Sequence, residues 1–392
     1  MNPVTEHSLL QRDQGDGIVG TLFTVYGIAL LIGALLLRFA GLDSGLPMNF
    51  DRAVFWAANS ITCTGFQALP NGLPEFSWAG LITVYGLVLI GAMLSMIIGS
   101  ILVCRYANLP HSPRRVIAAA CVLMITATLL GAGLLMSQER SFFEAIFEAT
   151  NVITNAGMSL TSPRDIGEWQ VQLVIIPFAA IGGLGLPVLI ELFDNIVLHR
   201  PISAYSRHVL WLSTAAWLAA FAILVMANTH LSWRQNILSS WTYAINSRSL
   251  GQEIPVSFGR VSWWLLSLFM LIGTAPAGTG GGVRLTSLSI AARQIRKVWA
   301  GEKPSAIFPL TAAWVVLFFG LGAILFLLLL SAEPGISSDR LALIASGAIG
   351  NTGISQDPLS MSSRGLTLLS TAMLAGHLLP LRFCAWLVEP VD

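Results

Sequence analysis

Long apolar stretches alternate with shorter, mixed segments along the whole chain. The long stretches cover roughly 18–40, 79–104, 116–137, 169–198, 208–229, 261–292, 308–332 and 362–388. Each is long enough for a helix that crosses a bilayer, which needs about 20 apolar residues. The shorter segments lie inside successive pairs of long ones, at roughly 50–61, 141–150, 234–246 and 338–348. These are too short to cross, so the pattern predicts four re-entrant half-helices.

A short glycine-bearing segment follows each half-helix, and the four recur at nearly even intervals. Their glycines are Gly65, Gly157, Gly251 and Gly353. Irregular backbone at membrane depth is tolerated only where protein buries it or where it lines a watery cavity. We therefore predict an all-α polytopic membrane protein of eight transmembrane spans. Four repeated units of helix, pore helix, filter loop and helix surround one pore with pseudo-fourfold symmetry.

The repeat sets the expected domain boundaries. An N-terminal tail covers 1–17, and pore repeats 1 to 4 cover 18–105, 106–200, 201–300 and 301–392. An intramembrane gating loop is expected at 274–284, inside the third repeat.

Composition agrees with a membrane protein, since 55% of the residues are hydrophobic and only 10% are charged. The net charge of +1 gives no case for binding nucleic acid. No paired aspartates, HExxH motif or serine with histidine lies inside the spans, so we expect neither catalytic residues nor an organic cofactor.

Basic residues gather in the linkers between repeats. They include Arg114, Arg115, Arg200, Arg296 and Lys297. Positive residues favour the cytoplasmic side, so both termini are expected there and the glycine loops open outward. The N-terminus lacks a basic leader and a cleavage site, so no removable signal peptide is expected.

Helix-start residues precede the half-helices. Ser141 with Glu144, and Ser232 with Gln235, have the capping-box spacing. Asn49 and Ser338 are candidate N-caps of the other two half-helices.

The glycine loops are the candidate selectivity filter. Glycine reaches, without penalty, the backbone angles that turn successive carbonyls toward one axis. Such carbonyls can replace the water around a monovalent cation. The expected ion-binding residues are Thr62, Cys63, Thr64, Gly65, Thr154, Asn155, Ala156, Gly157, Arg248, Ser249, Leu250, Gly251, Gly350, Asn351, Thr352 and Gly353.

A second glycine cluster interrupts the sixth apolar stretch. Four glycines in five residues cannot hold a regular helix, because each costs about 1 kcal/mol relative to alanine. The stretch is therefore expected to break below the filter, as a gate or as a kink that only permits close helix packing. The candidate gate residues are Gly278, Thr279, Gly280, Gly281, Gly282 and Arg284.

These motifs resemble those of the Trk/Ktr/HKT superfamily of potassium transporters, over roughly residues 18 to 388. The second filter, residues 155–160, is similar to the family's NAGFSL, and residues 350–355 resemble GTVGLS. The helix stretch 181–187 is similar to IGGLGFP. Residues 273–284 resemble the family's broken helix, GGSPGGTAGGIK.

The resemblance implies a potassium uptake pore subunit of the KtrB/TrkH type in a bacterial inner membrane, with K⁺ as the transported ion. It implies a homodimer and a cytoplasmic ring of nucleotide-binding RCK subunits of the KtrA/TrkA type. Arg284 would act as a positive barrier, or alternatively would cap half-helix carbonyls. Arg248 would hold filter or pore-helix carbonyls.

Some positions depart from the family pattern. Residues 89–94 lack its GGLG, and His377 stands where an arginine is usual. A sodium-permeable or weakly selective transporter therefore stays open as an alternative. A secondary carrier with inverted repeats is the other alternative, and it would place its broken helices in two inverted halves.

Overall fold

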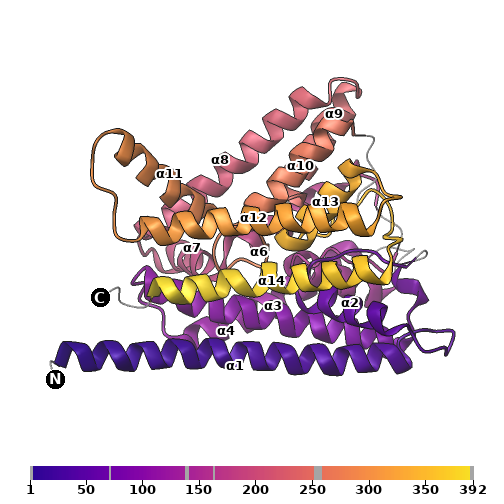
Figure 1. Ribbon diagram of the computed structural model, residues 1–392, viewed down its shortest axis with the longest axis horizontal. Helices are drawn as coiled ribbons and strands as arrows, with labels where there is room; N and C mark the ends of the chain where they lie inside the picture. The colour runs from indigo at the N-terminus through magenta and orange to yellow at the C-terminus, as the bar shows by residue number, and fades with distance from the viewer. Residues whose placement is uncertain (1–2, 70–71, 137–140, 162–163, 251–257, 389–392) are drawn as a thin grey trace.

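The computed structural model describes residues 3–69, 72–136, 141–161, 164–250 and 258–388. Within those ranges the protein is helical, and an isolated bridge between Leu42 and Phe76 is the only β-type pairing. Most helices run along the long axis of the molecule, and both termini lie at the left-hand end in Figure 1.

The first two repeats have the predicted order of elements. Repeat 1 comprises α1 (Pro3–Ala40), α2 (Phe50–Ile61), the short η1 (Leu73–Glu75) and α3 (Trp78–Tyr106). Repeat 2 comprises α4 (Pro113–Leu135), α5 (Phe142–Ile153), a π-helical turn η2 (Val171–Ile175), α6 (Ile176–Leu184) and α7 (Leu186–Leu198).

The last two repeats follow the same plan. Repeat 3 comprises α8 (Ala204–Ala227), α9 (Trp233–Asn246), α10 (Arg260–Ile272) and α11 (Leu285–Trp299). Repeat 4 comprises α12 (Phe308–Ala332), α13 (Ser338–Gly350) and α14 (Ser363–Val388). The predicted half-helices are therefore α2, α5, α9 and α13, and α2, α9 and α13 lie toward the right-hand end of Figure 1.

The four repeats close into a ring. Each short helix packs on the long helix that precedes it, in the pairs α1–α2, α4–α5, α8–α9 and α12–α13. A later helix of each repeat then packs on the short helix of the next, in the pairs α3–α5, α6–α9, α10–α13 and α14–α2. Because the last of these pairs returns to the first repeat, the ring has no open side.

Burial follows from this ring. The C-terminal halves of the short helices are largely buried, polar residues included. In α13 every residue from Leu341 to Gly350 is buried, and in α2 every residue from Phe55 to Ile61. The long outer helices instead expose apolar side chains such as Leu31, Ile125 and Val316. An outer surface of exposed apolar side chains around a buried interior is suited to contact with lipid.

Six helices of the described residues are long and apolar enough to cross a membrane: α1 from Gly20, α3, α4, α8, α12 and α14. The count rises to seven if η2 with α6 and the following α7 are taken together as one bent span. This pair bends by 105°, although the sequence predicted one continuous stretch. The bend lies at Gly185, whose φ of 87° lies outside the helical region and is readily reached by glycine. The expected count of eight spans requires the broken pair α10 and α11 to form the eighth.

The helix starts agree with the sequence at two half-helices and differ at the other two. Ser141 and Glu144 form the complete capping box of α5. The hydroxyl of Ser232 instead donates to the Gln235 side chain at 2.9 Å, and no cap hydrogen bond forms. Asn49 occupies the N-cap of α2 without a side-chain bond, and Ser337, not Ser338, is the N-cap of α13. Spacing alone does not determine which donor a short polar side chain will find.

Candidate functional site

Three of the four glycine loops share one backbone conformation. Cys63, Asn155 and Asn351, each two residues before the loop glycine, have φ of 53°, 56° and 47°. This left-handed region is uncommon for residues other than glycine, and strain of this kind gathers at functional sites. Because the same unusual backbone conformation occurs at the same place in repeats 1, 2 and 4, these three loops are structurally equivalent.

A shared hydrogen bond closes these three loops. The amide one residue before the glycine donates to a carbonyl five residues earlier, near the end of the half-helix. The bonds join Thr64 to Asn59 (3.0 Å), Ala156 to Asn151 (2.8 Å) and Thr352 to Gly347 (2.9 Å). Each half-helix therefore passes into its loop in the same way.

The loops meet at the centre of the ring. The Gly353 amide donates to the Thr64 carbonyl at 2.6 Å, and the Asn351 side-chain amide donates to the Thr64 hydroxyl at 3.0 Å. A Cβ on Gly65 would overlap the Ala156 carbonyl, and one on Gly353 would overlap the Phe66 amide. These contacts join the loops of repeats 1, 2 and 4 to one another.

Buried acceptor oxygens without partners lie in and beside the same loops. The side-chain oxygens of Asn151, Asn155 and Asn351 have no hydrogen-bond partner among the described residues. An unsatisfied buried acceptor is costly, and a hard cation prefers oxygen ligands. The chemistry of this centre therefore suits a cation.

The third loop differs from the others. Ser249 does not have the left-handed φ of its three counterparts, and its amide bonds to the Ile245 carbonyl at 3.1 Å. Arg248, Ser249 and Leu250 are buried. Gly251, the filter glycine predicted for this third loop, lies outside the described residues.

Asn59 is a bracing residue that the sequence patterns missed. Its side-chain oxygen accepts from the amides of Gly65 (3.0 Å) and Phe66 (2.9 Å), and its side-chain nitrogen donates to the Phe66 carbonyl at 2.9 Å. Asn59 is completely buried. The equivalent position of repeat 2 is also asparagine, Asn151, and this repetition is the signal that could have revealed it.

Glycines of the later helices form a second unrecognised set. A Cβ on Gly91, Gly182 or Gly376 would overlap the carbonyl of Ile61, Ile153 or Ile349, near the ends of α2, α5 and α13. These glycines therefore let each helix touch the last turn of its half-helix. Gly91 does so although residues 89–94 lack the family's double glycine.

The predicted break in the sixth stretch is present, between α10 and α11. Gly273, Ala277, Gly282 and Arg284 all have positive φ, from 60° to 80°. The segment 273–284 is buried almost throughout, and we call it the intramembrane loop. It is docked on the bend between α6 and α7, because Ala275 and Thr279 donate their amides to the Gly183 and Gly182 carbonyls at 3.3 and 3.0 Å.

The intramembrane loop also touches the filter loops. The Asn155 side-chain amide donates to the Thr279 hydroxyl at 2.6 Å, and that hydroxyl contacts the Ile153 carbonyl at 3.2 Å. A Cβ on Gly281 would overlap the Gly350 carbonyl in repeat 4. Thr279 and Gly281 therefore connect the loop directly to the filters of repeats 2 and 4.

Two buried arginines hold this loop in place. The guanidinium of Arg248 donates through Nε (3.0 Å) and Nη2 to the Gly273 carbonyl. This carbonyl belongs to the intramembrane loop, and not to the filter or half-helix that the sequence predicted. Arg284 donates to the carbonyls of Ala275 (3.2 Å), Gly278 (3.3 Å) and Gly280. Its guanidinium therefore closes the loop on itself.

A cavity of 160 Å³ lies on the far side of the loop from the filters. It is bordered by Arg284 and Pro276 of the loop, by Tyr205 and His208 of α8, and by Phe383 of α14. The cavity therefore borders the intramembrane loop at Pro276 and Arg284.

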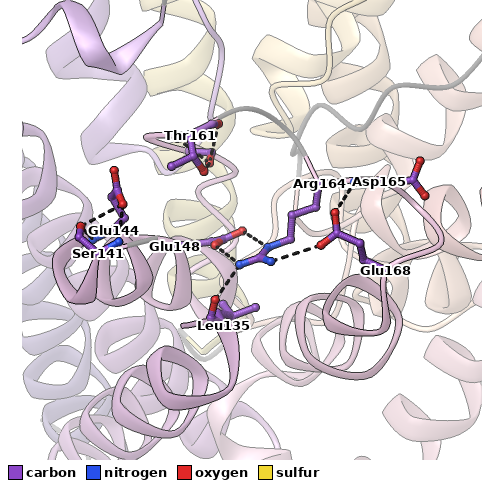
Figure 2. Close-up of polar contacts among 9 residues, drawn as sticks. Leu135, Ser141, Glu144, Glu148, Thr161, Arg164, Asp165 and Glu168 are labelled. Carbon is purple, nitrogen blue, oxygen red and sulfur yellow. Dashed lines mark hydrogen bonds and ion pairs between the residues drawn. The ribbon is translucent and has the colours of Figure 1, made fainter. Parts of the chain in front are cut away.

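A buried ion pair lies beside the second glycine loop (Figure 2). Arg164 lies after the filter and donates to both carboxylate oxygens of Glu148 on α5, each at 3.1 Å. Burial alone lowers the pKa of Arg164, but the hydrogen bonds and negative charges of Glu148 and Glu168 outweigh it and raise the pKa overall.

No family model matches the chain. Among curated proteins, it is 27% identical to "Ktr system potassium uptake protein B" of Bacillus subtilis, over 72% of this chain and 71% of that protein. It is 22% identical to the protein of the same name from Vibrio alginolyticus, over 97% and 93%. These relatives are named as transporters and not as enzymes.

Among solved structures, the chain matches the potassium transporter TrkH of Vibrio parahaemolyticus. The TM-score is 0.71 at 17% identity, over 93% of this chain and 83% of that one, which is a likeness of fold. The chain is therefore similar in sequence to Ktr potassium uptake proteins and similar in fold to TrkH.

Proposed function

We propose that the chain is the pore-forming subunit of a potassium uptake system. The observation that carries this proposal is the convergence of three equivalent loops at the centre of a closed ring of four repeats. Loop carbonyls there are suited to replace the water around an unhydrated monovalent cation. The names of the curated relatives support potassium as that cation.

In this proposal the four loops act as the filter and the intramembrane loop acts as the gate. The loop would stand between the filters and the cavity that its Pro276 and Arg284 border, so an ion would have to pass it. Arg284 would keep the gate closed by holding three of its carbonyls. The basic linkers would face the cytoplasm of a bacterial cell, with the filters opening outward.

Two rival functions of the same fold differ in what they require. A sodium-permeable transporter would need a filter that does not depend on all four glycines. A secondary carrier would need two inverted halves with matched broken helices. The closed ring of four like units favours a single pore over the carrier.

Cation flux into liposomes tests the function. We expect the purified protein to carry potassium, and to carry it faster than sodium at equal concentration, because four glycine loops form the filter. Liposomes without protein are the control. Equal rates for the two ions would favour the weakly selective alternative, and no flux of either ion would contradict the proposal.

We further propose that the chain works as a homodimer with one pore per subunit, controlled by a ring of nucleotide-binding RCK subunits. The exposed basic residues Arg293, Arg296 and Lys297 at the end of α11 are the proposed contact with the ring. α11 begins directly after the intramembrane loop, so a pull on it would reach the gate. Native mass spectrometry in detergent measures the dimer, and a monomer that conducts without responding to any such ring would refute both claims.

A further inference from the structure

The ion pair of Arg164 and Glu148 joins three separate elements. Arg164 is bidentate on Glu148 in the middle of α5, and its Nη2 also donates to the Leu135 carbonyl at 2.8 Å. Leu135 is the last residue of α4, where helix carbonyls have no partner of their own. Figure 2 shows the guanidinium between these groups, with Glu168 on its other side.

Because this ion pair is buried, each charge depends on its partner for compensation. Glu148 is 2% exposed and Arg164 is 6% exposed. Charge-assisted bidentate pairs combine energy with a defined geometry, and removing one partner leaves the other charge buried and uncompensated. Glu168 adds a third charge from the half-exposed side, with its carboxylate 3.3 Å from the Nη1 of Arg164.

The pair encloses the second filter. Thr154 to Met158 lie between Glu148 and Arg164, so the filter strand is attached at both ends. One end continues from α5, and the other is tied back to the same helix by Arg164. Arg164 therefore ties the chain that follows the filter to the helix that precedes it.

In the fourth repeat an exposed ion pair likewise joins the half-helix to the chain after the glycine loop, with the two charges exchanged. Arg340 near the start of α13 pairs with Asp357, four residues after Gly353, at 2.7 Å. The two side chains are 47% and 59% exposed, and exposed pairs of this kind contribute little to stability. The ion pair beside the second loop is thus buried, whereas the one beside the fourth loop is exposed.

We propose that Arg164 and Glu148 are positioning residues that set the ion selectivity of the pore by holding the second filter at a fixed distance from the axis. This inference rests on the proposed transport function. Neither residue touches the ion in this account. Their effect passes through the backbone of residues 154–158.

The test compares potassium and sodium flux in liposomes for Arg164→Lys and for the wild type. Lysine keeps the positive charge but loses the planar fork that grips both carboxylate oxygens. We expect the potassium-to-sodium ratio to fall about tenfold, which corresponds to about 1.4 kcal/mol. A merely structural role would lower the flux of both ions together and leave the ratio unchanged.

The double variant Glu148→Gln with Arg164→Gln is the second arm, since it leaves no unpaired buried charge. We expect its potassium-to-sodium flux ratio to fall at least as far as that of Arg164→Lys. Arg340→Lys is the matched control on the exposed pair, and its ratio is expected to stay within about twofold of the wild type. An unchanged ratio in Arg164→Lys or in the double variant would overturn the inference. The absence of selective potassium flux in the wild type would instead overturn the proposed function.

Discussion

Replacing Gly65 with serine is expected to remove most of the preference for potassium over sodium. Gly65 has a φ of 98°, which strains any side chain, and a Cβ there would overlap the Ala156 carbonyl of the neighbouring filter. The serine would push the first and second filter loops apart and so change the distance between their carbonyls. We expect the flux ratio in liposomes to fall by about tenfold or more, equivalent to at least about 1.4 kcal/mol.

Gly45→Ser is the matched control for this variant. Gly45 also has a positive φ, of 70°, but no atom lies within 4 Å of the position of its Cβ. It therefore carries a similar backbone strain without the contact to a second filter. We expect its flux ratio to equal that of the wild type. Unchanged ratios in both Gly65→Ser and Gly353→Ser would remove these loops from the selectivity mechanism.

The repeated elements could be predicted from the sequence because they depend on local patterns. A half-helix needs a short apolar run, and a break in the sixth stretch needs the glycines at 278 and 280–282. Both are properties of neighbouring residues, and the structure has them where they were expected. The left-handed conformation of Asn155 and Asn351 was not predicted, although asparagine tolerates that region.

The contacts that hold the site together could not be predicted in this way. Arg164 and Glu148, or Thr279 and Asn155, are brought together by the packing of the ring, and nothing in their spacing points to a partner. The carbonyl that Arg248 holds lies 25 residues further along the chain. The bend at Gly185 was missed because the glycines of residues 181–187 and Pro187 are also compatible with a continuous apolar helix.

Deleting Gly280 and Gly281 from the intramembrane loop is expected to raise potassium flux. The loop lies beneath the filters, where its amides bond to Gly182 and Gly183 and its Thr279 hydroxyl holds Asn155. The deletion removes one of the three carbonyls that Arg284 grips and the close contact of Gly281 with Gly350. We expect flux to increase about tenfold, equivalent to a barrier lower by about 1.4 kcal/mol.

Arg284→Gln separates loss of the anchor from loss of loop length. This variant keeps every loop residue but removes the charge that holds the carbonyls of Ala275, Gly278 and Gly280. If Arg284 keeps the gate closed, flux rises in this variant as it does in the deletion. If Arg284 only shapes the loop, flux rises in the deletion alone. Elution in detergent checks that both variants are folded. If folded variants both show wild-type flux, the loop is not the barrier. The filter loops, where the Gly353 amide donates to the Thr64 carbonyl, would then have to close the pore themselves.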